Sequence, residues 1–142
     1  MSNTTAPDPI LLTRRYQFCC SHRLHSPRLS AARNQELYQE CNNRFGHGHD
    51  YVLEVTFKGE IDPITGMGVE LTTVDRIIQR EVVERYDHKH LNYDVKDFKG
   101  LVPTGENILR VIWKRLSEKV HKRKIYKLKL IETSNNYFEY YG

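Results

Sequence analysis

Residues 49–61, "HDYVLEVTFKGEI", alternate between apolar and polar side chains and predict a β-strand with one buried face. The side chains expected on that face are His49, Tyr51, Leu53, Val55 and Phe57. The sequence "DPITG" at 62–66 is typical of a turn, and residues 67–71 are expected to pair back as a hairpin. The histidine at the start of the strand therefore belongs to a face that is otherwise apolar.

The segments around this strand predict a β-β-α-α-β-β order with an insert after the first strand. The expected elements are a strand at 10–21, a short helix at 30–40, a helix after residue 71, a loop at 87–94, a second long helix from Pro103 and Thr104, and strands at 124–133 and 136–141. Apolar residues at helical spacing (Val74, Ile78 and Val82) indicate the first long helix, and Thr72 with Asp75 is a variant capping box at its start.

Length and composition indicate a single α+β domain. The chain has 142 residues, of which 39% are hydrophobic and 28% charged, and no repeat or linker divides it. Residues 1–9 are expected to be a disordered tail and 10–142 the folded domain. No stretch approaches the roughly 20 apolar residues of a membrane helix, no secretory signal is visible, and three cysteines cannot all form disulfides. These features favour the cytoplasm, and the net charge of +4 suits an anionic small molecule or weak nucleic-acid contact.

The stretch "CNNRFGHGHDY" at 41–51 places a thiol six residues before a His-Gly-His pair. His47 and His49 are two residues apart, so both rings project from one face of a strand. His22, at the end of the first strand, is a candidate third ligand because neighbouring strands lie only about 5 Å apart. Three neutral imidazoles are typical of a catalytic zinc site with an open fourth position. Two alternatives stay open: surface histidines without a metal, and a closed structural site in which Cys41 is the fourth ligand.

Two carboxylates lie in positions that indicate chemistry. Asp87 precedes His88, and a carboxylate that accepts a bond from an imidazole orients it and raises its basicity for proton relay. Glu132 ends an apolar stripe in "YKLKLIET" (126–133). There it can accept two hydrogen bonds from the exocyclic amine and ring N–H of a purine-like or pterin-like ring. A solvated loop histidine and a fraying strand end are the alternative interpretations.

Six motifs in one order resemble the 6-pyruvoyl-tetrahydropterin synthase family, a group that also contains the 6-carboxy-tetrahydropterin synthases. The motifs, between residues 14 and 141, are "FCCSHRL", "CNNRFGHGHDY", "GEIDPITGMGVEL", "DHKHLN", "PTGEN" and "LIETSNN". The resemblance implies a tunnelling (T-) fold, which is a β-β-α-α-β-β unit with an antiparallel sheet and two helices on one face. It also implies that such units close into trimeric barrels, that two trimers stack as a homohexamer, and that active sites lie between subunits.

The resemblance further implies roles for individual residues. The implied ligands of one zinc per subunit are His22, His47 and His49; the implied catalytic residues are Cys41, Asp87 and His88; and the implied pterin-binding residues are Glu132, Thr104 and Glu106. Arg14, Arg23 and Arg28 are unranked candidates for binding a triphosphate, which magnesium could accompany.

The implied activity is the zinc-dependent conversion of 7,8-dihydroneopterin triphosphate to 6-pyruvoyl-tetrahydropterin with elimination of triphosphate. This is a lyase reaction of tetrahydrobiopterin biosynthesis. The six-residue spacing from Cys41 to His47 is similar to that of the pyruvoyl enzymes, whereas the carboxy enzymes typically have a shorter gap. Two alternatives remain: a 6-carboxy-tetrahydropterin synthase of deazapurine (queuosine) biosynthesis, and a small basic module with a closed structural zinc site that binds nucleic acid.

Three positions depart from the pattern of the family. Cys19, followed by Cys20, stands where a small hydroxylated residue is usual, and these thiols are expected either to oxidise or to pack. His90 stands where Asn is common, and Gly105 where a hydroxyl residue or Ala is frequent. Gly105 is therefore expected to cost a hydrogen bond in the pocket. His90, like His25 and His121, is expected at the surface.

Overall fold

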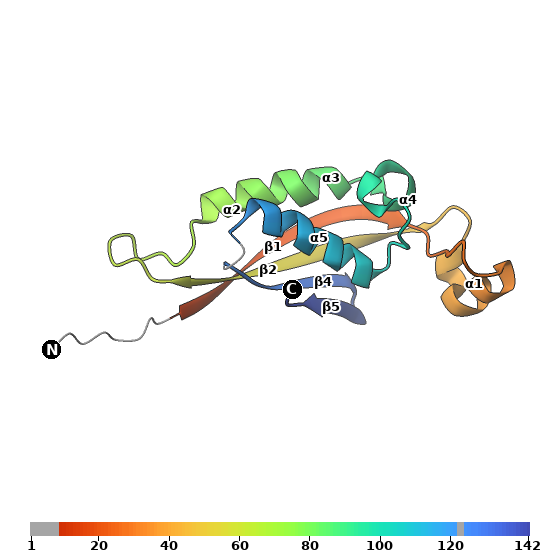
Figure 1. Cartoon of the computed structure of the whole chain (residues 1–142), viewed down its shortest axis with the longest axis horizontal. Coiled ribbons are helices and arrows are strands. Elements are labelled where there is room, and N and C mark those ends of the chain that lie inside the picture. The colour runs from red at the N-terminus through yellow and green to blue at the C-terminus, as the bar shows by residue number, and fades with distance from the viewer. Residues whose placement is uncertain (1–8, 122–123) are drawn as a thin grey trace.

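The computed structural model describes residues 9–121 and 124–142, which form one five-stranded sheet with long helices over one face (Figure 1). The strands are β1 (Pro9–His22), β2 (His47–Glu60), β3 (Lys89–His90), β4 (Ile125–Thr133) and β5 (Asn136–Tyr140). Their order in the sheet is β3-β1-β2-β4-β5, and every neighbouring pair is antiparallel except β1 with β3. The expected antiparallel α+β architecture is confirmed. Apart from Pro9, which begins β1, the tail expected at 1–9 lies outside the described residues.

Two long helical segments cover the sheet, and a third helix projects from its end. The helices are α1 (Ala31–Tyr38), α2 (Leu71–Ile78), α3 (Glu84–Tyr86), α4 (Leu91–Asp94) and α5 (Gly105–Lys119). Figure 1 shows α2, α3 and α5 over the same face of the sheet, whereas α1 lies beyond the end of β1 and β2. The loop expected at 87–94 contains the short β3 and α4. Within the described part of the chain, no helix is both long and apolar enough to span a bilayer.

The register of β1 and β2 continues the buried face of the sheet into a cluster of histidines. The aligned pairs on this face are Tyr16–Leu53, Phe18–Tyr51, Cys20–His49 and His22–His47. The first two pairs lie in the hydrophobic core, and the period of two then carries the same face on to the histidines. The pairing of strands that are far apart in sequence therefore brings His22 to the His-Gly-His pair.

A bulge in the pairing of β2 with β4 changes the face of one tyrosine. Ile125 and Leu128 are both buried, and Tyr126 is exposed. The expectation that Tyr126 shares the apolar face was wrong, because a register shift moves the alternation by one residue at this point. From Leu128 to Glu132 the period of two holds, so Glu132 lies on the face that carries the histidines.

The start of the first long helix differs from the expectation. Residues 67–71 form no strand in the described chain, and α2 begins at Leu71 with Glu70 as an N-cap that makes no side-chain bond. The capping box of Thr72 and Asp75 was wrong, because the helix begins before Thr72 and Asp75 is engaged elsewhere. Asp75 accepts hydrogen bonds from Arg14 (3.1 and 2.5 Å) and from Tyr16 on β1.

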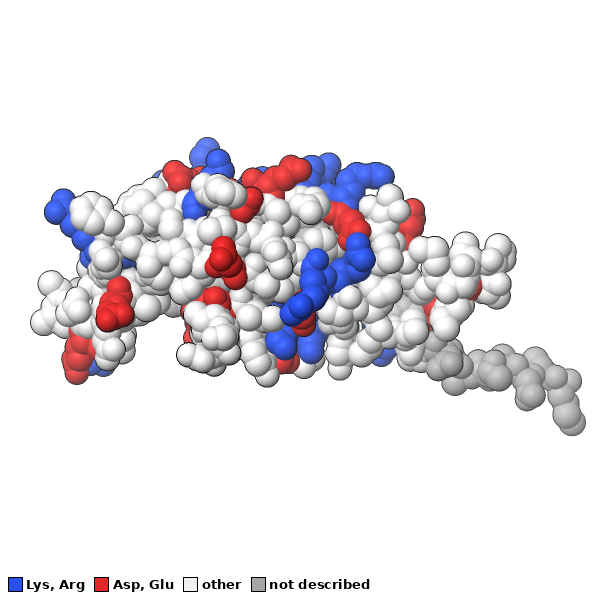
Figure 2. Space-filling model, turned by 180° about the vertical axis from the view of Figure 1, so that it is seen from behind, with Lys and Arg blue, Asp and Glu red and all other residues white. Residues whose placement is uncertain are grey.

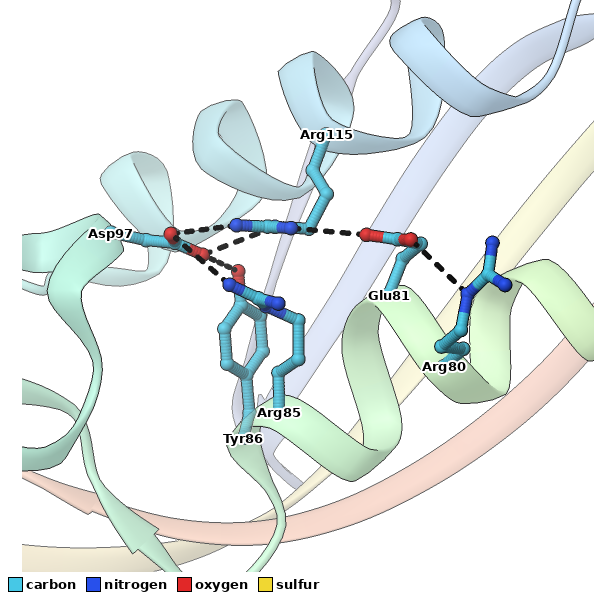
Figure 3. A network of polar contacts seen from close by, with 6 residues as sticks. All are labelled: Arg80, Glu81, Arg85, Tyr86, Asp97 and Arg115. Atoms are coloured by element: carbon cyan, nitrogen blue, oxygen red, sulfur yellow. Dashed lines mark hydrogen bonds and ion pairs between the residues drawn. The ribbon is translucent and has the colours of Figure 1, made fainter.

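A network of ion pairs joins this helix to α5. A π-helical turn at Gln79–Val83 links α2 to α3 and buries Glu81 beside α5. The members of the network, shown in Figure 3, are Arg80, Glu81, Arg85, Tyr86, Asp97 and Arg115. Arg115 donates to Glu81 at 3.0 Å and to Asp97 at 2.7 and 3.1 Å. Burial alone raises the pKa of Glu81, but the bond from Arg115 and the nearby cationic side chains outweigh it and leave this pKa below its ordinary value.

We expect the substitution Arg115→Met to lower the free energy of unfolding by roughly 2–3 kcal/mol, because it leaves two carboxylates in a mostly buried position without their shared partner. Urea denaturation measures this loss. Arg110→Met, an exposed position on the same helix, is the control and should change stability by less than about 0.5 kcal/mol. An equal change in the two variants would contradict a stabilising role for the network.

This network also makes stability depend on pH. The pKa of Glu81 is lower in the folded than in the unfolded protein, so its contribution is complete above the unfolded value of about 4.3 and is lost as the pH falls below it. The difference in stability between wild type and Arg115→Met should therefore shrink towards acid pH.

The face of the sheet away from the helices carries charges of both signs. Seen from behind, Lys and Arg side chains lie next to Asp and Glu side chains (Figure 2). On the sheet, Lys127 lies 3.7 Å from Glu139, and Lys129 lies 4.1 Å above the ring of Tyr137. Two cations of the basic run at 119–130 thus have partners within the chain, and residues 122–123 of that run lie outside the described residues. This arrangement does not favour a stripe that binds nucleic-acid phosphates.

Candidate active site and metal centre

Three histidines meet at the end of the β1–β2 pair. The ring nitrogens that His22, His47 and His49 can offer to a metal all lie within 4.8 Å of one another. Nε2 of His22 is 3.1 Å from Nε2 of His47. In the residues that the structure describes, this is the only group of three or more His, Cys, Asp or Glu side chains arranged in this way. The expected convergence of the three imidazoles is therefore present.

The surroundings of His22 fit it to bind a metal ion. Its side chain is almost fully buried, and Nδ1 lies 2.7 Å from the carbonyl oxygen of Pro103, which can only accept a hydrogen bond. The proton is therefore on Nδ1, and the lone pair of Nε2 faces His47. Burial lowers the pKa of His22 to about 4 and also lowers that of His47, so both rings are neutral at neutral pH. Three imidazoles with this geometry are a donor set that suits zinc.

Cys41 lies beside the histidine cluster but outside its ligand set. It is half-buried and lines a cavity of about 680 Å³ together with His47 and His49. Its sulfur does not belong to the group of atoms within 4.8 Å of one another, which favours an open metal site over a closed one with a fourth thiolate ligand. Burial, followed by the charges of Glu132 and Glu40, raises the pKa of the Cys41 thiol. Positive charge must therefore be added to this cavity before the thiolate is favoured.

Glu132 is held on the same face by two side chains that the sequence did not single out. The Tyr51 hydroxyl donates to Oε2 of Glu132 at 3.2 Å, and Nδ2 of Asn136 donates to Oε1 at 3.2 Å. The Tyr51 hydroxyl also lies 3.5 Å from Nδ1 of His22, so this tyrosine links the carboxylate to the histidine cluster. Tyr51 was expected only as a core residue. The one signal for Asn136 was its place in the motif "LIETSNN" (130–136).

Thr104 and Glu106 have structural explanations at the start of α5. The Thr104 hydroxyl accepts a hydrogen bond from the amide of Asn107 at 3.2 Å and caps the helix, whose start the sequence predicted at Pro103 and Thr104. Glu106 is exposed in the first turn, where a carboxylate is favoured by the helix dipole. Among the described residues neither side chain forms a hydrogen bond with Glu132, so their part in a pterin pocket stays a prediction.

Asp87 and His88 form the expected hydrogen-bonded pair, but His88 and Cys41 line different cavities. Nδ1 of His88 is 2.9 Å from Oδ2 of Asp87, and the backbone of Cys19 on β1 holds both residues through bonds to the Asp87 carboxylate (2.8 Å) and from the His88 amide (2.6 Å). The bond from the Cys19 amide and the bond from His88 keep the pKa of Asp87 below its ordinary value despite the opposing effect of burial. His88 is 82% exposed and lines a cavity without Cys41. One chain therefore does not bring the pair to the thiol.

The remaining cysteines and histidines occupy contrasting environments. Cys19 is exposed, whereas Cys20 is buried, and burial raises the pKa of its thiol to about 12, so Cys20 packs in the core as an unreactive thiol. The expectation that His90 is a surface residue was wrong. Both of its ring nitrogens are buried and have no partner among the described residues, and the ring packs against Gly46. His25 is half-buried and bonded to Asn42 at 2.9 Å.

The absence of a side chain at Gly105 has a packing cause. A Cβ at this position would overlap the ring of Phe138 on β5. We therefore expect Gly105→Ala alone to lower the free energy of unfolding by roughly 1–3 kcal/mol through overpacking. The double variant Gly105→Ala/Phe138→Val should be no less stable than Phe138→Val alone, because the smaller side chain leaves room for the methyl group. Thermal unfolding of the four proteins tests this, and a Gly105→Ala protein as stable as wild type would contradict it.

Comparison with known proteins gives one consistent result. The family model described as 6-pyruvoyl tetrahydropterin synthase matches residues 11–142. The chain is 41% identical over 131 residues to 6-pyruvoyl tetrahydrobiopterin synthases from Poecilia reticulata and Homo sapiens, which covers 92% of this chain and 89% and 90% of those proteins. It superposes on the structure of Caenorhabditis elegans 6-pyruvoyl tetrahydropterin synthase with a TM-score of 0.91 at 36% identity, over 96% of this chain and 97% of that one. The chain therefore belongs to the 6-pyruvoyl tetrahydropterin synthase family.

Proposed function

We propose that this protein is a zinc-dependent 6-pyruvoyl-tetrahydropterin synthase that converts 7,8-dihydroneopterin triphosphate to 6-pyruvoyl-tetrahydropterin and triphosphate. The names of the relatives support the activity. The observation that carries the zinc dependence is the convergence of three imidazoles, whose ligand atoms lie within 4.8 Å of one another, beside a thiol outside that group. This geometry is typical of catalytic rather than structural zinc.

Glu132 is the residue that binds the pterin ring. Tyr51 and Asn136 hold one oxygen each and fix the orientation of the carboxylate. The lone pairs that remain can accept hydrogen bonds from the ring N–H and exocyclic amine of a pterin. Because Glu132 lies on the same sheet face as the histidines, a ring bound there directs its side chain towards the histidine cluster.

Cys41 is the base that removes a proton from the side-chain carbon of the substrate. It lines the same cavity as His47 and His49, so a substrate side chain held at the cluster lies within its reach. A zinc ion bound by the three histidines would act as a Lewis acid towards the substrate hydroxyls and would add positive charge near the thiol. A pterin that donates two hydrogen bonds to Glu132 also offsets one of the negative charges that raise the Cys41 pKa.

A second copy of the chain supplies Asp87 and His88 to this site. In one chain His88 is exposed beside the half-buried Asp87, and His88 lines a cavity that Cys41 does not line. Assembly of subunits can bring this pair of one copy to the thiol of another, where the Asp87 carboxylate orients His88 for proton transfer. This arrangement agrees with active sites between the subunits of a homohexamer.

Incubation of the purified zinc-loaded protein with 7,8-dihydroneopterin triphosphate, followed by mass spectrometry of the product, tests the proposal. We expect 6-pyruvoyl-tetrahydropterin and one equivalent of triphosphate. A carboxy product would assign the protein to the 6-carboxy-tetrahydropterin synthases instead. Unchanged substrate would contradict both assignments.

A further inference from the structure

A basic cavity is built in part from two chain segments that also hold His22 of the histidine cluster. It has a volume of about 630 Å³, a size ordinary for small-molecule sites, and its cationic or titratable basic residues are Arg23, His25, Arg28 and Lys99. In the described part of the chain, no Asp or Glu lines it. Arg23 directly follows His22, the histidine of β1 that belongs to the cluster. Val102, in the cavity wall, directly precedes Pro103, whose carbonyl oxygen accepts a hydrogen bond from His22. The cavity and the histidine cluster therefore share two segments of the chain.

Among the residues that the structure describes, no carboxylate forms an ion pair with the Arg or Lys side chains of this cavity. The half-buried Arg23 is positioned by bonds from its Nε to the carbonyl of Asn42 (3.2 Å) and from its amide to Asn92 (2.8 Å), which leaves the two terminal nitrogens of its guanidinium for a ligand. Arg28 and Lys99 are exposed. Over residues 9–121 and 124–142 none of the three takes part in an ion pair. Uncompensated cations around a concave surface attract anions.

The third arginine named from the sequence does not belong to this site. Arg14 forms a two-bond ion pair with Asp75, and that bond, followed by the charge of Asp75, raises the pKa of Arg14. It contributes no residue to the basic cavity. The structure thus separates Arg23 and Arg28, which share one cavity, from Arg14, which holds a helix to a strand.

We infer that the basic cavity binds the triphosphate group of the substrate through Arg23, Arg28 and Lys99. The inference rests on the proposed function, because that function identifies the substrate. It adds the place in the protein where the triphosphate, the leaving group of that substrate, is bound. Guanidinium groups match phosphate oxygens with paired hydrogen bonds, and an ammonium group adds a further positive charge. When the carbon–oxygen bond breaks, the triphosphate leaves with the electron pair of that bond. Cations in the cavity therefore stabilise the group that departs, as well as the bound substrate.

Binding of inorganic triphosphate to the whole protein tests the cavity without any turnover. By isothermal titration calorimetry, we expect the double variant Arg28→Gln/Lys99→Gln to bind inorganic triphosphate at least about tenfold more weakly than wild type. The control is Arg76→Gln/Lys58→Gln, which removes two exposed cations on α2 and β2 that do not line the basic cavity, and it should bind as wild type does. Equal binding by the double variant and the wild type would overturn the inference.

Kinetics then show whether this anion is the substrate's own triphosphate. Inorganic triphosphate should inhibit competitively with 7,8-dihydroneopterin triphosphate, and the double variant should raise KM about tenfold or more. Inhibition that is not competitive would place the anion elsewhere and overturn the inference. If the wild type does not turn over the substrate, the proposed function fails, and the difference in triphosphate binding between the two double variants still decides whether the cavity is an anion site.

Discussion

Changing His47 to Ala should reduce the zinc content from about one ion per chain to less than about 0.1 after dialysis, because two imidazoles alone cannot hold the ion. Mutation of a residue that only hydrogen-bonds to a metal ligand typically weakens metal affinity about 10–100-fold. Loss of a direct ligand should weaken the zinc affinity by more than that. Turnover should fall to background because the metal is lost. Elemental analysis of the dialysed protein measures the zinc, and His49→Ala should give the same result because its ring belongs to the same cluster.

His121→Ala is the matched control for this experiment. His121 is exposed and lines a different cavity from the one that contains His47, so its removal should leave the zinc content at the wild-type level. Added zinc should raise the melting temperature of wild type and His121→Ala but not of His47→Ala, since only a folded state with an intact site gains from binding. A His47→Ala protein that retains a full equivalent of zinc would show that the ion is held elsewhere.

Replacing Cys41 by Ala should lower kcat by a factor of roughly 10² to 10⁴, the range typical of losing a positioned general base. The zinc content and the unfolding transition should stay close to those of wild type, because the thiol lies outside the group of converging ligand atoms. Steady-state kinetics, elemental analysis and thermal unfolding of the same preparation separate these effects. Full turnover would refute the assignment of Cys41 as the base.

Cys19→Ala is the appropriate comparison for the thiol substitution. Cys19 is exposed, and its backbone rather than its sulfur holds Asp87 and His88, so its removal should change kcat little. If Cys41→Ala instead lost its zinc and unfolded, the metal would be structural and the thiol its fourth ligand. That outcome would favour the closed site of a binding module over an enzyme.

Much of the site could be predicted from the sequence because its signals are local. A period of two along β2 sets which side chains share a face, and this placed His47 and His49 on the side of the core. The end of β1 at His22 and the start of α5 near Thr104 followed from similarly short patterns. The adjacency of Asp87 and His88 was enough to predict their hydrogen bond.

Several outcomes that the sequence did not predict depend on contacts between segments that are distant in sequence. Asp75 bonds to Arg14, 61 positions away, instead of capping its own helix. Gly105 is small because of the Phe138 ring, and Tyr126 is exposed because of a register shift between two strands. Propensity describes a residue and its near neighbours, whereas each of these outcomes depends on which surface packs against it.

The functional groups of this protein can be read directly from the order of its residues: three imidazoles, a thiol, an Asp-His pair and a carboxylate at the end of an apolar stripe. How they are grouped follows from the way the chain folds. Strand register brings His22 to His47, places Tyr51 between His22 and Glu132, and leaves the Asp-His pair apart from Cys41 within one chain. The reason is physical: side-chain identity is written residue by residue, but a shared cavity exists only after strands and loops far apart in the chain have packed together.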